Sequence, residues 1–129
     1  MTLKKYSLEE IQNLEISLVP GDRVYLYGDL GSGKTTFSGA IISKLLGKKS
    51  VIKSPTYVYY RKYEPNIYHF DLYRIEDYDA FVAIGGEEIF ENPDAICLVE
   101  WPEMVESRYK PTIKIHLQKT EDELTRDHR

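Results

Sequence analysis

The chain has 129 residues, of which 42% are hydrophobic and 29% are charged, which suits one globular domain with a modest core and leaves no room for a second. Lys and Arg total 17 against 21 Asp and Glu, and the resulting net charge of −4 argues against a broad basic surface for nucleic acid. A single cysteine, Cys97, rules out an internal disulfide and has the apolar neighbours of a core residue. Because no signal peptide or membrane-length apolar segment is visible, we expect a cytoplasmic protein with one domain over residues 1–129 and a mobile tail from about residue 120.

The first half of the chain predicts two helices and a strand. Residues 7–18 begin with a capping box and continue with apolar residues at helical spacing, so they predict an amphipathic helix that ends at Pro20. A short apolar strand is expected at Val24–Tyr27. A second helix is predicted to begin near Lys34 and to stop at Gly47, where its helical apolar spacing ends.

The middle of the chain predicts a β-hairpin followed by short helices. Residues 54–63 hold β-branched and aromatic residues in rough alternation and predict a strand, and residues 67–70 predict its antiparallel partner after a turn. We expect this hairpin to lie beside the glycine-rich loop described below. Residues 76–90 predict two helical pieces with a break around Gly85-Gly86.

Two further strands complete the predicted fold. The continuous apolar run Ala95–Val99 is typical of a central parallel strand covered on both faces. Residues 112–117 alternate cleanly and predict an edge strand. The order of elements predicts an α/β fold with a mixed sheet and flanking helices.

The loop between the first strand and the second helix has the sequence of a phosphate-binding loop. Gly28–Thr35 fits the pattern G-x-x-x-x-G-K-[ST] at every fixed position, in the strand–loop–helix context that the pattern needs. Glycines let the backbone approach the phosphates, Lys34 reaches the β- and γ-phosphates, and Thr35 offers a hydroxyl to Mg²⁺. The residues expected to bind the nucleotide are Asp29, Leu30, Gly31, Ser32, Gly33, Lys34, Thr35 and Thr36.

Hydrolysis also needs a carboxylate for the metal and a group that orients water. Glu100 follows the continuous apolar strand and is the candidate metal ligand, whereas Asp71 follows the hairpin and is the candidate for orienting water or accepting its proton. Either carboxylate could instead cap a turn. The candidate catalytic residues are therefore Lys34, Asp71 and Glu100, with Thr56 as a possible switch that senses the γ-phosphate and Trp101 as an aromatic that covers the site or contacts a partner.

Three function classes other than an ATPase also use a phosphate-binding loop. A Ras-type GTPase is disfavoured because the guanine-reading motif N/T-K-x-D is absent from the sequence, so ATP is the expected nucleotide. A small-molecule kinase would need an arginine-bearing lid, and the arginines after the loop do not cluster in the sequence. The third alternative to an ATPase, a protein whose docking to a partner is controlled by nucleotide binding, stays open.

Four ordered motifs resemble the TsaE (YjeE) ATPase family. They are Gly28–Thr36, Ser54–Tyr57, His69–Arg74 and Val99–Glu103, and the resemblance extends from about residue 7 to residue 117. The resemblance implies an α/β P-loop fold. It places the family's magnesium ligands at Thr35 and Glu100, its switch threonine at Thr56, its candidate catalytic aspartate at Asp71 and its tryptophan at Trp101.

The resemblance also implies a function. Members of this family bind ATP with Mg²⁺ and hydrolyse it weakly by themselves. They are thought to act on the TsaB–TsaD complex, which transfers threonylcarbamoyl to adenosine 37 of tRNAs that read ANN codons. Contact with tRNA would then be indirect, and no membrane would be involved. The first helix of the family helps to form the base pocket, which would place Ser7 near it.

Overall fold

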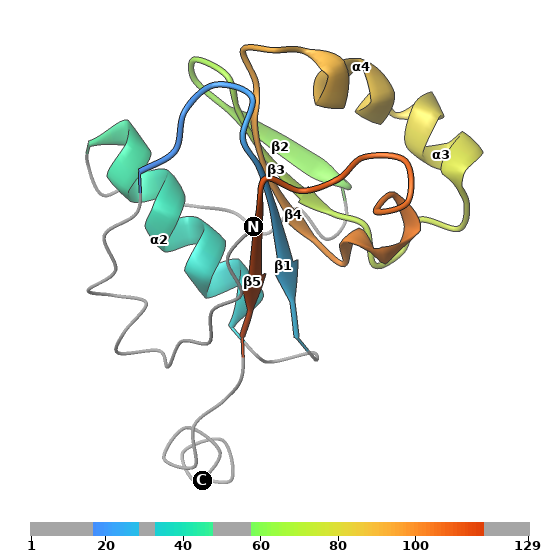
Figure 1. Ribbon diagram of the computed structural model, residues 1–129, viewed down its shortest axis with the longest axis horizontal. Coiled ribbons are helices and arrows are strands. Elements are labelled where there is room, and N and C mark those ends of the chain that lie inside the picture. The colour runs from blue at the N-terminus through green and yellow to red at the C-terminus, as the bar shows by residue number, and fades with distance from the viewer. Residues whose placement is uncertain (1–16, 29–32, 48–57, 118–129) are drawn as a thin grey trace, which may run out of the picture.

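A computed structural model describes residues 17–28, 33–47 and 58–117. Figure 1 shows its helices and strands. In chain order they are β1 (Arg23–Tyr27), α2 (Lys34–Leu46), β2 (Tyr60–Tyr63), β3 (Ile67–Asp71), α3 (Tyr78–Ala83), α4 (Gly86–Glu91), β4 (Ile96–Glu100), the 3₁₀ helix η1 (Pro102–Met104) and β5 (Ile113–His116).

The strands form one mixed sheet in the order β2-β3-β4-β1-β5. β1 is parallel to β4 and to β5, β3 is parallel to β4, and only β2 runs antiparallel to its neighbour β3. This topology confirms the predicted α/β fold, with β4 in the centre and β5 at one edge. The hairpin is confirmed as well, but β4 separates it from β1, so it does not lie directly beside the strand that leads into the loop.

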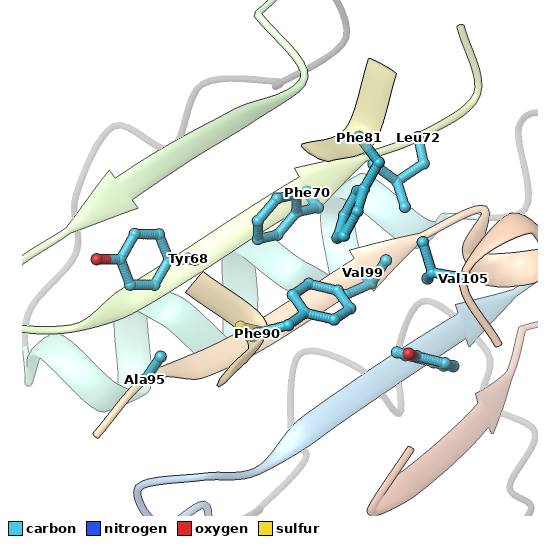
Figure 2. Packing of buried hydrophobic residues seen from close by; sticks show 10 residues of the cluster. Tyr68, Phe70, Leu72, Phe81, Phe90, Ala95, Val99 and Val105 are labelled. Atoms are coloured by element: carbon cyan, nitrogen blue, oxygen red, sulfur yellow. The ribbon is translucent and has the colours of Figure 1, made fainter. Parts of the chain in front are cut away.

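Helices cover both faces of the sheet (Figure 1). Under α2, the buried residues are Val24, Leu26, Phe37, Ile41, Ile42, Ile67, Leu98, Ile115 and Leu117. The second cluster, whose labelled side chains Figure 2 shows on the face turned away from α2, contains aromatic residues of the sheet and of α3 and α4, such as Phe70, Phe81 and Phe90. β4 contributes to both clusters, which explains why its sequence is apolar without interruption.

Cys97 lies in the second cluster, as its apolar neighbours predict. Its side chain is buried, and that burial raises the pKa of the thiol to about 12. Such a thiol is inert at neutral pH, so the predicted structural role of Cys97 is confirmed.

The ends of α2 follow the prediction closely. Gly33 precedes the helix at a φ of 98° and Gly47 follows it at a φ of 73°, both in the left-handed region that glycine adopts without steric cost. The break between α3 and α4 falls at Gly85, as predicted, with a φ of 87°. Asp77 caps α3, since its side chain accepts a hydrogen bond of 2.8 Å from the backbone N–H of Ala80.

Two predicted elements are shorter than expected where the structure describes them. The strand predicted over 54–63 begins only at Tyr60, because Tyr59 has a φ of 67° and interrupts the extended backbone. Residues 17–19, the end of the first predicted helix, have no regular secondary structure. The rest of that helix, residues 54–57 and the tail from residue 118 lie outside the described residues.

Gly86, at the start of α4, is a position where an added methyl group is expected to destabilise the fold. A Cβ built there would lie 2.4 Å from a ring carbon of Phe81, whose ring is fully buried. We expect Gly86→Ala to lower the free energy of unfolding by about 1–3 kcal/mol, as overpacking usually does. Urea unfolding of Gly86→Ala, Phe81→Leu and the double variant tests this cause. Because leucine lacks the ring, the double variant should lose less than the sum of the two single losses, and simple additivity would contradict the steric explanation.

Candidate functional site

The candidate site lies where β1 passes into the glycine-rich loop and α2. Gly28 leaves β1 with a φ of 146°, and Gly33 leads into α2 in the left-handed conformation. These two glycines show why the pattern needs residues without a Cβ at both ends of the loop. The intervening Asp29, Leu30, Gly31 and Ser32, expected to bind phosphate, lie outside the described residues.

Lys34 is held over the loop. Its side chain is buried, and its Nζ donates a hydrogen bond to the backbone carbonyl of Gly28. Nζ also lies 3.8 Å from the centroid of the Trp101 ring, in a cation–π contact. The ammonium group of Lys34 therefore contacts both the carbonyl oxygen of Gly28, the first residue of the loop, and the ring of Trp101, which is predicted from the sequence to cover the site or contact a partner. Thr36, in contrast, is exposed.

Glu100 meets Thr35 across the edge of the sheet. β1 and β4 are parallel, so their carboxyl ends lie together, and Leu26 is the register partner of Glu100. The hydroxyl of Thr35, 65 positions away in the sequence, lies 3.1 Å from Oε1 and 3.2 Å from Oε2 of Glu100. Glu100 is almost completely buried, with 3% of its surface exposed. The two residues predicted as metal ligands thus contact each other.

Asp71 lies beside Glu100 at the end of the neighbouring strand. The two are register partners between β3 and β4, and Asp71 is buried. One oxygen of Asp71 accepts a hydrogen bond of 3.0 Å from the backbone N–H of Tyr73. The carboxylate therefore caps a turn, which is the alternative role considered for it, and it does so next to the candidate metal ligand.

Trp101 follows Glu100 in a left-handed conformation, with a φ of 58°. This backbone geometry turns the chain after β4, and the indole contacts Lys34 on one side and the ring of Tyr73 at a centroid distance of 4.9 Å. The structure thus places Trp101 at the site, as the sequence suggested. The predicted switch residue Thr56 lies outside the described residues.

His69 is the residue at this site to which sequence reasoning gave no function. Its Nε2 lies 2.5 Å from Oε2 of Glu100, and the ring is completely buried. The sequence carried one signal for it. Side chains alternate between the two faces along a strand, so His69 and Asp71 in β3 point to the same face of the sheet. Without the register between β3 and β4, nothing in the sequence related that face to Glu100.

A separate set of side-chain contacts holds the end of β1 in place. The Tyr27 ring stacks on His116 at a centroid distance of 4.6 Å, and its hydroxyl donates a hydrogen bond to Glu106. Lys114 lies 3.1 Å from the same carboxylate. Burial and the contact with Glu106 raise the pKa of Tyr27, whereas the hydrogen bond from Tyr27 lowers the pKa of Glu106. These contacts fix Tyr27, the residue directly before the loop.

The donors at the site suit magnesium in combination with a nucleotide. Within the described ranges no group of three or more His, Cys, Asp and Glu side chains is arranged to hold a metal by itself. Mg²⁺ commonly takes only one or two protein oxygens and completes its shell with phosphate and water. The hydroxyl of Thr35 and the carboxylate of Glu100 fit that requirement.

A parallel strand, a glycine-rich loop ending in Gly-Lys-Thr and a helix, with a carboxylate at the end of the adjacent strand, define a P-loop NTPase fold. A model of the family "Threonylcarbamoyl adenosine biosynthesis protein TsaE" matches residues 5–128. The chain belongs to the TsaE family, which confirms the resemblance seen in its motifs.

Curated relatives named "tRNA threonylcarbamoyladenosine biosynthesis protein TsaE" are similar over most of the chain. The protein of Haemophilus influenzae is 45% identical over 83 residues, which are 62% of this chain and 51% of the relative. That of Rickettsia typhi is 38% identical over 100 residues, 75% of this chain and 68% of the relative. That of Bacillus subtilis is 38% identical over 92 residues, 69% of this chain and 56% of the relative. The chain thus spans about half to two thirds of these relatives.

The structure contains no candidate for a membrane-spanning helix in residues 17–28, 33–47 and 58–117, since none of the helices there is both long and apolar enough.

Proposed function

We propose that this protein binds ATP with Mg²⁺ and hydrolyses it, and that hydrolysis supports the threonylcarbamoylation of adenosine 37 in tRNAs that read ANN codons. It would do so in the cytoplasm by acting on the TsaB–TsaD complex, with tRNA contacted indirectly. Membership of the TsaE family supports the pathway. The observation that supports the chemistry is the contact between Glu100 and Thr35, the residue that follows Lys34 at the start of α2.

The proposed roles follow from what each side chain can reach. The loop from Asp29 to Thr36 binds the phosphates with its backbone N–H groups, at the positive end of the α2 dipole. Lys34 exchanges its contact with the Gly28 carbonyl for phosphate oxygens and balances the negative charge that develops there. Thr35 and Glu100 would hold Mg²⁺, which would neutralise negative charge on the phosphates.

Asp71 and the remaining residues serve the attacking water and the response to nucleotide. Asp71 orients water toward the γ-phosphorus and accepts its proton as the bond to the leaving ADP breaks. Thr56 senses the γ-phosphate as a switch. Trp101 covers the loop through its contact with Lys34, and its other neighbour, Tyr73, is half exposed and extends this aromatic surface toward solvent.

ATP hydrolysis by the purified protein, alone and with TsaB and TsaD, tests the proposed function. We expect weak hydrolysis alone, strong stimulation by the partners, and repeated rounds of tRNA modification only when ATP turnover is possible. The contrary result is tight ATP binding without stimulation by the partners, with ATP turned over only when a small metabolite is supplied. That result would identify a P-loop kinase.

Replacing Asp71 should separate hydrolysis from binding. Asp71→Asn keeps an oxygen that can accept the hydrogen bond from Tyr73, but it removes the group that takes the proton. We expect the rate of hydrolysis to fall by about 10²- to 10⁴-fold, the usual contribution of a general base, while the ATP dissociation constant stays near that of the wild type. Rapid-quench turnover and calorimetric binding measure the two quantities. A comparable loss of ATP affinity would remove the assigned role.

A further inference from the structure

The buried histidine of β3 has an unusual set of partners. His69 is fully buried, its Nε2 contacts Oε2 of Glu100 at 2.5 Å, and its Nδ1 has no hydrogen-bond partner within the part of the chain that the structure describes. Burying an imidazole costs free energy unless its polar atoms are paired. This ring therefore has one strong polar contact, and that contact is with Glu100.

The chemistry of the two partners fixes the direction of the hydrogen bond. A carboxylate only accepts hydrogen bonds, so Nε2 of His69 carries the hydrogen and donates it to Glu100. The other ring nitrogen, Nδ1, is then an acceptor, which is the tautomer that leaves no buried N–H group unpaired.

Side chains from two different elements contact the carboxylate of Glu100. Thr35 reaches both of its oxygens from the start of α2, and His69 reaches Oε2 from β3. The hydroxyl of Thr35 is itself a proposed ligand of Mg²⁺. His69 is thus the side-chain partner of Glu100 that is not itself a proposed ligand of the ion.

We propose that His69 is a positioning residue: its hydrogen bond holds the Glu100 carboxylate against Thr35 in the orientation that receives Mg²⁺ with the nucleotide. This proposal rests on the proposed function, since it assumes that Glu100 serves the metal. Hydrogen bonds to a metal-binding side chain fix its orientation, and losing one typically lowers metal affinity or activity by about 10- to 100-fold.

Two substitutions distinguish positioning from simple filling of the core. His69→Leu occupies similar space and removes the donor, whereas His69→Gln can place an amide N–H near the position of Nε2. Ile67→Val, two residues earlier on the same face of β3, is the matched control because Ile67 is buried in the cluster under α2 and is not among the residues placed at the site. Thermal unfolding verifies that each variant is folded.

The decisive measurement is the Mg²⁺ concentration required for tight ATP binding, determined by calorimetry or by the fluorescence of Trp101. We expect His69→Leu to raise this concentration by about 10- to 100-fold while ATP binding in EDTA is unchanged. His69→Gln should recover most of the loss, and Ile67→Val should match the wild type. An unchanged Mg²⁺ requirement in His69→Leu, or equal losses in the leucine and glutamine variants, would overturn the positioning role.

Nuclear magnetic resonance of the nucleotide-free protein gives an independent signature. Histidine ¹⁵N shifts should show the hydrogen of His69 on Nε2, and Glu100→Gln should move that signal. A hydrogen on Nδ1 would overturn the proposal. A wild-type protein that binds ATP equally well with and without Mg²⁺ would overturn the proposed function itself, whereas a normal wild-type response beside an unchanged His69→Leu variant would overturn only the role of the histidine.

Discussion

Replacing Lys34 by alanine is expected to weaken binding of Mg²⁺-ATP by at least about 10- to 100-fold. A hydrogen bond to a charged group contributes about 1.5–3 kcal/mol, and each 1.4 kcal/mol corresponds to a factor of ten. The ammonium group contacts the carbonyl of Gly28, the first residue of the loop, and the ring of Trp101, so the substitution removes a positive charge from the site. Calorimetric titration with ATP in the presence of Mg²⁺ measures the loss.

A second lysine of the same helix provides the control for this prediction. Lys44 is exposed in the last turn of α2, far along the helix from the loop. Lys44→Ala removes the same charge from the protein and should leave ATP affinity within the small effect of a surface charge. If both variants lost affinity equally, net charge and not the position of Lys34 would explain nucleotide binding.

Trp101 offers a direct optical readout for the same experiment. It is the only tryptophan of the chain, and its ring lies 3.8 Å from Nζ of Lys34. We expect ATP to draw the ammonium group away from the ring and so to change the tryptophan emission of the wild type. Lys34→Ala should remove that response.

The second large effect is expected for Glu100→Gln, which should reduce ATP hydrolysis by about 10²- to 10³-fold, the usual cost of removing one positioned electrostatic group. Glutamine has nearly the same shape and retains an oxygen that can accept hydrogen bonds from Thr35 and His69. The fold should therefore survive, whereas the charge that attracts Mg²⁺ is lost. Single-turnover hydrolysis and the Mg²⁺ dependence of ATP binding report on these two consequences.

Glu103 is the matched control for this variant, because it is an exposed carboxylate three residues further along the chain. Glu103→Gln should hydrolyse ATP at the wild-type rate. A reconstituted reaction with TsaB, TsaD and tRNA adds a sharper distinction. Should Glu100→Gln still support repeated modification at full rate, nucleotide binding and not turnover would be the useful event, as in a protein whose docking is gated by nucleotide.

The elements on either side of the phosphate-binding loop could be predicted from sequence because their determinants are local. The ends of α2 depend on glycines at fixed positions, Gly33 and Gly47, and the central strand depends on an uninterrupted apolar run. Even the approach of Glu100 to Thr35 was predictable, because parallel strands bring their carboxyl ends to one edge of a sheet.

What the sequence did not predict depends on pairing between distant segments. The contact between His69 and Glu100 requires that β3, and not β1 alone, lies next to β4, and no local pattern encodes that order. The late start of β2 depends on the left-handed backbone of Tyr59, a conformation that an aromatic residue rarely adopts and that its sequence context did not indicate. In both cases tertiary structure determines the outcome and local propensity does not.

The backbone conformation of Trp101 sets the thermal stability of this protein against the contacts that its site needs. An L-residue with a Cβ in the left-handed region costs roughly 1–2 kcal/mol, a cost that glycine would avoid. At a φ of 58°, tryptophan is thus an unfavourable residue for the backbone at position 101. Its ring, however, contacts the ammonium group of Lys34 and the ring of Tyr73. Selection for more heat-resistant variants of this chain would favour glycine at this position. Each such variant would leave Lys34 without its aromatic neighbour.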